Sequence, residues 1–135
     1  MTVKSILHFS LLETTMTTTN HVKRYEQLKV LSAQLISEIP EVMAGFGELH
    51  SSAVAEGALS TKSKELIALG IAIAVHCDVC IAFHVHDALN AGASRQETME
   101  AIGVAILMGG GPSMVYGCEA LEALNEFELQ QNPPI

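Results

Sequence analysis

Two cysteines and two acid–base side chains are the residues of this sequence whose types and spacing could do chemistry. Cys77 and Cys80 are three positions apart and His84 follows four positions later, so on a helix all three lie on one face. If Cys77 stands at the N-terminal edge of that helix, the helix dipole and free N–H groups favour a thiolate. The spacing also allows a disulfide, so that one sulfur can attack an oxidant while the other resolves the product.

Glu65 is the carboxylate that could act with these thiols. It precedes Cys77 by twelve positions and is followed by ten apolar residues, so we expect it on a different helix and at least partly buried. A buried carboxylate needs a partner, and His84 is the natural candidate. Such a Glu–His pair beside a thiol can take its proton and return it later.

Apolar periodicity and helix punctuation predict about six helices that position these residues. Asn20 is the expected N-cap of the first helix, Pro40 opens the second, and Ser94 with Glu97 forms a capping box that starts the fifth. The expected helices cover about 20–38, 40–57, 61–75, 78–90, 94–109 and 112–130. No strand pattern competes with them, so we predict a single all-α helical bundle.

The chain is divided by the same signals into three parts. We expect residues 1–19 to be a flexible N-terminal extension, in which Met16 is an alternative start, residues 20–131 to be the helical domain, and residues 132–135 to be a tail. No apolar run reaches the roughly 18 residues that a membrane span needs. Three cysteines, two of them in a C-x-x-C, fit a cytosolic redox or metal motif, so we predict a cytoplasmic protein.

Composition excludes some classes of partner. The formal net charge is −8, which argues against nucleic acid and against an anionic membrane surface. Nearly half of the residues are apolar but only 4% are aromatic, so the core must be aliphatic. Because the apolar run after Glu65 covers the whole circumference of a helix in a short chain, we also expect subunits that bury it together as a homo-oligomer.

The spacing of the four chemical residues resembles a family signature. Glu65, eleven residues, Cys77, two residues, Cys80, three residues and His84 is similar to the motif of the AhpD-like alkylhydroperoxidases within the carboxymuconolactone decarboxylase superfamily. The flanking segments 62–67 and 84–93 agree, and the resemblance covers about residues 40–130, most specifically 60–93.

The resemblance implies an AhpD-like all-helical fold, a homo-oligomer that is a trimer or hexamer, and a peroxidase cycle with no cofactor and no metal. Its substrate would be a hydroperoxide, and a thiol or dithiol would donate the electrons. By the same resemblance Cys80 would be the peroxidatic thiol and Cys77 the resolving one, while Glu65 and His84 would form the proton relay.

The residues between the cysteines depart from part of this family. Some members carry a histidine there that joins the relay, whereas this chain has Asp78 and Val79. Asp78 places a negative charge beside Cys77, which opposes thiolate formation. Thiol–disulfide chemistry is therefore better supported by the sequence than efficient peroxide turnover.

Two other functions fit parts of the pattern. Cys77, Cys80 and His84, with His76 or His86 nearby, could bind zinc in a structural or regulatory protein, although no second C-x-x-C supplies further ligands. A decarboxylase-type enzyme would instead use the Glu–His pair alone. The decarboxylating branches of the superfamily lack the cysteine pair, so its presence argues against that activity. The redox function is the one that the sequence favours.

Three further features are interpreted as structural. Cys118 lies in the last expected helix among small residues and is read as a packing thiol. Gly109–Gly111 lack the Lys-Ser/Thr of a phosphate-binding loop and predict a tight turn between helices. His76 and His86 are expected to be structural or surface residues.

Overall fold

The computed structural model describes residues 20–135, and within this range the chain is helical with no strand. The helices are α2 (His21–Glu38), α3 (Pro40–Val54), α4 (Thr61–Ala74), α5 (Asp78–Asn90) and α6 (Arg95–Gln131). The prediction of an all-α fold is confirmed. The expected extension 1–19, with its alternative start at Met16, lies outside the described residues.

The helices begin where the sequence predicts. The side chains of Asn20 and Ser60 each accept a hydrogen bond from the backbone N–H three residues on, and Ser94 with Glu97 forms the capping box. Pro40 lies in the first turn of α3, where its missing N–H costs nothing. These caps satisfy backbone groups that would otherwise lack a partner.

The end of the second predicted helix is wrong by three residues. The helix was expected to reach Gly57, but α3 ends at Val54 and Ala55 has extended backbone angles. The Nζ of Lys64 donates a hydrogen bond to the carbonyl of Ala55, and this bond from α4 stabilises the non-helical connection. That contact is tertiary, so local sequence signals could not reveal it.

Helix α6 is folded back on itself at Gly110. This residue has φ 69° and ψ −151°, which is outside the helical region and easiest for glycine. Arg95 near the start of α6 donates hydrogen bonds to Asn125 and Glu128 near its end. In a straight helix residues 95 and 128 would be about 50 Å apart, so the two halves of α6 must run antiparallel. They correspond to the fifth and sixth predicted helices.

The turn also bears on whether α6 could cross a membrane. Among the described helices, only α6 is long and apolar enough for that. Because Gly110 divides it into halves of 15 and about 20 residues, the first half is too short for a span of about 20 residues. The second half carries Glu119, Glu122 and Glu126 within three turns, which no bilayer core would accept without cost.

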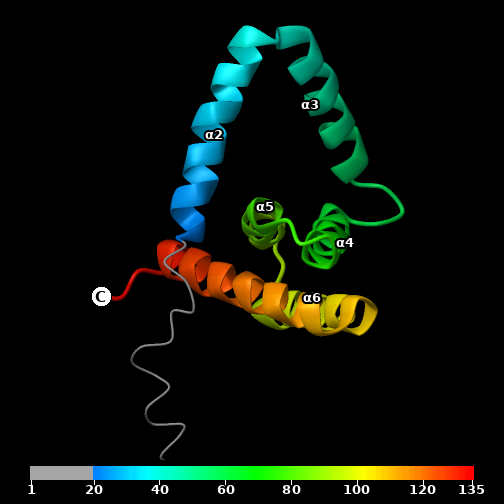
Figure 1. Ribbon diagram of the computed structural model, residues 1–135, viewed down its shortest axis with the longest axis vertical. Helices are drawn as coiled ribbons and strands as arrows, with labels where there is room; N and C mark the ends of the chain where they lie inside the picture. Colours follow the sequence, from blue (N-terminus) through cyan, green and yellow to red (C-terminus); the bar gives the residue numbers. More distant parts are fainter. Residues whose placement is uncertain (1–19) are drawn as a thin grey trace, which may run out of the picture.

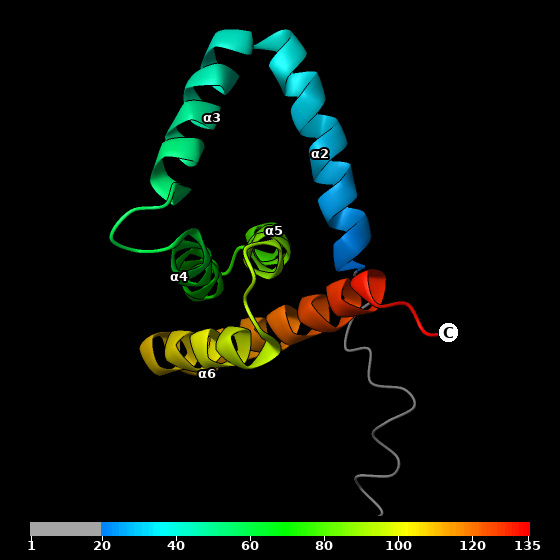
Figure 2. The same ribbon diagram turned by 180° about the vertical axis from the view of Figure 1, so that it is seen from behind.

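Helices α4, α5 and α6 pack into a block that contains the core (Figures 1 and 2). The largest fully buried apolar side chains come from all three helices: Leu69, Ile73, Ile81, Val85, Leu124 and Phe127. As composition predicts, five of these six are aliphatic. The block holds α4 against α5, and this packing sets the distance between the residues predicted to do chemistry.

Helices α2 and α3 form an arm, residues 21–54, that extends from the block in an inverted V (Figure 1). Only the base of the arm is buried, through His21 and Tyr25 of α2, and α3 has no buried residue. The ring of Tyr25 stacks on His86 with centroids 4.2 Å apart and meets the edge of Phe127. The base of α2 is therefore fixed to the block, the end of α3 meets α4, and most of the arm between these two points is exposed.

Candidate active site

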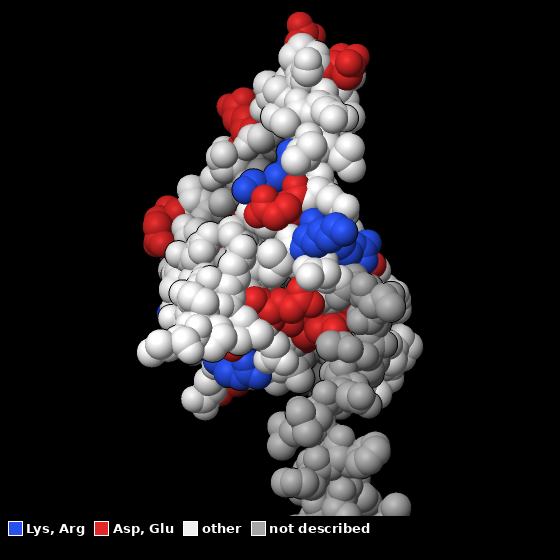
Figure 3. Space-filling model, turned by 90° about the vertical axis from the view of Figure 1, so that its left-hand side faces the viewer, with Lys and Arg blue, Asp and Glu red and all other residues white. Residues whose placement is uncertain are grey.

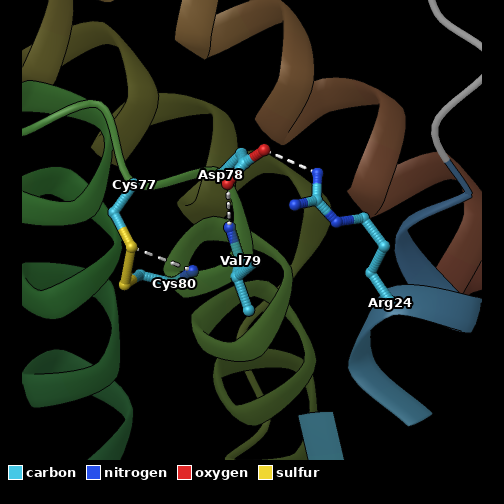
Figure 4. The surroundings of a disulfide bond; sticks show 5 residues. All are labelled: Arg24, Cys77, Asp78, Val79 and Cys80. Atoms are coloured by element: carbon cyan, nitrogen blue, oxygen red, sulfur yellow. Dashed lines mark hydrogen bonds and ion pairs between the residues drawn. A yellow bond between two sulfur atoms is a disulfide. The ribbon is translucent and has the colours of Figure 1, made fainter. Parts of the chain in front are cut away.

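Cys77 and Cys80 are joined by a disulfide at the start of α5, with their Cα atoms 5.2 Å apart (Figure 4). Cys77 is the N-cap residue of α5, and its Sγ accepts a hydrogen bond of 3.3 Å from the backbone N–H of Cys80. Both residues are partly buried. The chain therefore folds so that the two sulfurs can bond, and the helix N-terminus points a donor at one of them.

Glu65 and His84 meet across the interface between α4 and α5. Glu65 is only 2% exposed, and its Oε2 lies 2.8 Å from Nδ1 of His84. His84 is one helical turn beyond Cys80, so it lies on the face of α5 that carries this cysteine. The structure thus joins buried Glu65 to partly buried His84, and His84 follows Cys80 by one turn of α5.

Arg24 compensates the charge of Asp78, which the sequence predicted to oppose thiolate formation. Its guanidinium reaches from α2 to Oδ2 of Asp78 at 2.5 Å, while Oδ1 accepts a hydrogen bond from Val79 (Figure 4). Burial raises the pKa of Asp78, but these hydrogen bonds and the charge of Arg24 outweigh it and hold the pKa below its ordinary value. The carboxylate is therefore paired rather than directed at Cys77.

His50 and Asp87 are site neighbours that sequence reasoning missed. One ligand atom from each of them and from Glu65 lies within 4.8 Å of the other two. Nε2 of His50 is buried without a hydrogen-bond partner among the described residues, and its ring meets the edge of Phe83. No motif marks His50, which reaches Glu65 only because the end of α3 returns to α4.

The remaining histidines have structural contacts. His86 bonds Asp87 through Nδ1 at 2.8 Å in addition to its stacking on Tyr25. His76 has a φ of 62° at the turn between α4 and α5, and its ring stacks on Tyr116 with centroids 4.5 Å apart. These contacts agree with the structural interpretation of both residues.

The expected alternative of a Cys/His metal site is not assembled in the described part of the chain. The sulfurs of Cys77 and Cys80 are bonded to one another, which removes the thiolates that zinc would need. Two other groups of residues in the described range do place potential ligand atoms together: His50, Glu65 and Asp87, and His21, Glu119 and Glu122.

The profile of the carboxymuconolactone decarboxylase family matches residues 40–123, and the chain belongs to this family. The match includes all four candidate site residues. Among relatives, an uncharacterised protein of Cupriavidus necator is 38% identical over 89 residues, which are 64% of this chain and 79% of the relative. Uncharacterised protein 4 of the cox locus in Paracoccus denitrificans is 37% identical over 83 residues, or 62% and 75% of the two chains.

Solved structures share the fold. The apo form of a carboxymuconolactone decarboxylase family protein from Legionella pneumophila aligns with a TM-score of 0.77 at 42% identity, over 79% of this chain and 96% of that one. A family protein from Thermotoga maritima, for which a role in the antioxidative response has been suggested, aligns with a TM-score of 0.72 at 27% identity, over 81% and 94%. The predicted superfamily is therefore confirmed.

Proposed function

We propose that this protein is a thiol-dependent oxidoreductase that reduces hydroperoxides, or exchanges disulfides, by cycling Cys77 and Cys80 between dithiol and disulfide. The observation that carries the proposal is the Cys77–Cys80 disulfide at the start of α5 with the buried Glu65–His84 pair one turn further on. Membership of the family supports it, as does the antioxidative role suggested for the Thermotoga maritima relative.

In the proposed first step, Cys80 is the peroxidatic thiol. Its thiolate attacks the outer oxygen of a hydroperoxide, the O–O bond breaks, and an S–O bond forms. The Glu65–His84 pair takes the thiol proton beforehand and returns it to the departing alkoxide, which leaves as an alcohol. The sulfur is oxidised to a sulfenic acid and the peroxide is reduced.

In the proposed second step, Cys77 resolves the sulfenic acid. Its thiolate attacks the Cys80 sulfur, the S–S bond forms, and hydroxide leaves and is protonated to water. An external thiol or dithiol then attacks Cys80 and displaces Cys77 as a thiolate, which leaves the donor bonded to Cys80 as a mixed disulfide. A second donor thiol attacks the donor sulfur of this bond, so that Cys80 leaves as a thiolate and the donor is released as its disulfide. The N–H of Cys80 that points at the Cys77 sulfur stabilises the departing Cys77 thiolate.

The cycle uses only the side chains of this chain and an external donor. The proposed cycle needs no metal or organic cofactor, because the electrons pass from the donor thiol through the two cysteine sulfurs to the hydroperoxide. Reduced thiol donors are abundant in the cytoplasm, so the proposed function also places the protein there.

Mass spectrometry after one equivalent of an organic hydroperoxide tests the proposal. We expect the reduced protein to form the Cys77–Cys80 bond, Cys80→Ser to lose hydroperoxide consumption, and Cys77→Ser to accumulate sulfenic acid or a mixed disulfide. Cys118→Ser is the matched control and should behave as the parent. A Cys80→Ser variant as active as the parent contradicts the proposal.

The family name supports one alternative, a decarboxylase-type enzyme that uses Glu65 and His84 without the cysteines. The double variant Cys77→Ser/Cys80→Ser separates the two functions. Decarboxylation of a lactone by this variant at the rate of the parent would favour the alternative, and its absence in both proteins is expected.

We also propose that the protein is a homo-oligomer, a trimer or hexamer. The arm exposes apolar side chains, including Val42, Phe46 and Leu49, and an apolar groove runs between α4 and α6. One chain thus carries both an apolar projection and an apolar groove, so a second copy of this chain is the occupant that fits both. Sedimentation that shows a stable monomer at micromolar concentration would contradict this assembly.

A further inference from the structure

His21, the first residue of α2, is a buried histidine that the proposed redox chemistry does not use. Its side chain has no exposed surface, and neither ring nitrogen makes a hydrogen bond to a described residue. Nε2 lies 3.4 Å from Oε2 of Glu119 and 3.5 Å from Oε2 of Glu122. Buried polar atoms that lack a hydrogen bond are costly, so this ring needs a reason to lie there.

The two glutamates come from consecutive turns of the second half of α6. Glu119 and Glu122 are three residues apart, so their side chains share one face of the helix, and each is only 17% exposed. Glu126 follows one turn later on that face and accepts a hydrogen bond from the N–H of Val22. This bond, together with the burial of His21, fixes the start of α2 over the glutamates.

The charge around His21 is strongly negative. Three glutamates of α6 face the start of α2, and Asp78 of α5 is near enough to interact with His21 electrostatically. Figure 3 views the side of the molecule on which α2 meets α6, and acidic side chains gather there beside basic ones.

The distances from Nε2 of His21 to the two carboxylate oxygens fit ligands of one metal ion better than they fit hydrogen bonds. Hydrogen bonds to nitrogen have lengths of about 2.7–3.2 Å. By contrast, nitrogen and oxygen ligands at about 2.0–2.2 Å from a tetrahedral ion stand about 3.3–3.5 Å from each other. The distances from His21 to both glutamates have that value, and all three ligand atoms lie within 4.8 Å of one another.

We propose that His21, Glu119 and Glu122 bind a divalent transition-metal ion, Zn²⁺ by geometry and ligand type, at a site separate from the cysteine pair. Neutral imidazole and carboxylate are common zinc ligands. The ion would link the first turn of α2 to α6, and so hold the base of the arm on the block. It acts on the fold and takes no part in the thiol cycle.

Zinc titration of the full-length protein tests this site. The protein carries Cys118→Ser and is held as the Cys77–Cys80 disulfide, so that no free thiol competes, and it is freed of metal with a chelator that is then removed. We expect calorimetry to give one Zn²⁺ per chain, and zinc to raise the melting temperature, because an ion that binds only the folded state stabilises it.

Two conservative variants and two controls locate the ion. Glu119→Gln and Glu122→Gln keep the side-chain size and should each weaken zinc binding at least tenfold, since even the outer partners of metal ligands change affinity by about 10–100-fold. Glu100→Gln, on an exposed part of α6, should bind as the parent does. His50→Gln should also bind as the parent does, because it alters only the other potential ligand group.

Several results would overturn the proposal. Failure of the parent to bind zinc, or an unchanged melting temperature in zinc, would do so without any variant. Zinc binding that survives in Glu119→Gln/Glu122→Gln, or that is lost in His50→Gln, would place the ion elsewhere. None of these results depends on hydroperoxide activity, so the metal site and the redox function succeed or fail separately.

Discussion

The α4–α6 block and the α2–α3 arm use the same kinds of aliphatic side chain in opposite ways. Leu69 of α4 is fully buried, whereas Leu49 of α3 is 65% exposed. The block therefore builds a core within one chain but also keeps exposed apolar side chains along the groove between α4 and α6, whereas the arm leaves most of its apolar surface uncovered. The residues of the proposed thiol chemistry all belong to the block, where the packing of α4 on α5 sets the distance between them.

The largest effect should come from the buried acid–base pair of the block. Glu65→Gln removes the carboxylate that lies 2.8 Å from Nδ1 of His84, and general acid–base catalysis contributes about 10²–10⁴-fold to a rate. We expect the rate of Cys80 oxidation by an organic hydroperoxide to fall by about that factor. Stopped-flow measurement on the reduced protein checks this, with exposed Glu100→Gln as the control. An undiminished rate in Glu65→Gln would remove the carboxylate from the mechanism.

Removing a core side chain should have the next largest effect, and comparing it with the same change in the arm tests the difference between the two regions directly. Leu69→Ala should lower the free energy of unfolding by about 2–5 kcal/mol, because it leaves a cavity in a fully buried position. Leu49→Ala should act only through subunit contacts, so its effect should depend on protein concentration, whereas that of Leu69→Ala should not. Urea unfolding at several protein concentrations measures both. Equal decreases in the free energy of unfolding of Leu69→Ala and Leu49→Ala would contradict the distinction between block and arm.

A charge on the arm should weaken assembly while sparing the fold of each chain. Phe46→Glu puts a carboxylate where 63% of the side chain is exposed, and burying that charge between subunits is costly. We expect the dissociation constant of the oligomer to rise at least tenfold, while the helical circular dichroism signal stays the same. Sedimentation velocity compares it with Glu48→Gln, a matched exposed position on α3. An unchanged distribution would show that the arm is not an interface.

The smallest effect concerns the ion pair that ties the arm to the block. Arg24 and Asp78 are 35% and 44% exposed, so Asp78→Asn should cost less than about 1 kcal/mol at pH 7. The folded-state pKa of Asp78 lies below the ordinary value of 3.8, so the stabilisation is present above pH 3.8 and is lost as the pH falls through the folded-state pKa.

Unfolding measured between pH 7 and pH 3 should therefore bring Asp78→Asn and the parent together at the acid end. Glu26→Gln is the comparison within the arm, because Glu26 forms an ion pair with exposed Lys29 three residues on along the same helix. It should change stability less than Asp78→Asn at every pH. A difference between Asp78→Asn and the parent that grows toward low pH would contradict the assigned direction of the pKa shift.

The local structure of this chain could be predicted from its sequence. Asn20, Ser60 and the Ser94–Glu97 capping box start helices because their side chains satisfy orphan backbone N–H groups within three residues. The glycine run at 109–111 predicts the turn that folds α6 back. The C-x-x-C placed two thiols at one helix start because that distance is set by neighbouring turns of one helix.

The contacts between distant segments were decided only by the tertiary structure. Arg24 neutralises Asp78 across 54 residues, and His50 approaches Glu65 only because the end of α3 returns to α4. The burial of His21 against Glu119 likewise depends on how α2 packs against α6. Such contacts follow from the packing of whole helices, which is fixed by the sum of many weak interactions rather than by any short pattern of residues.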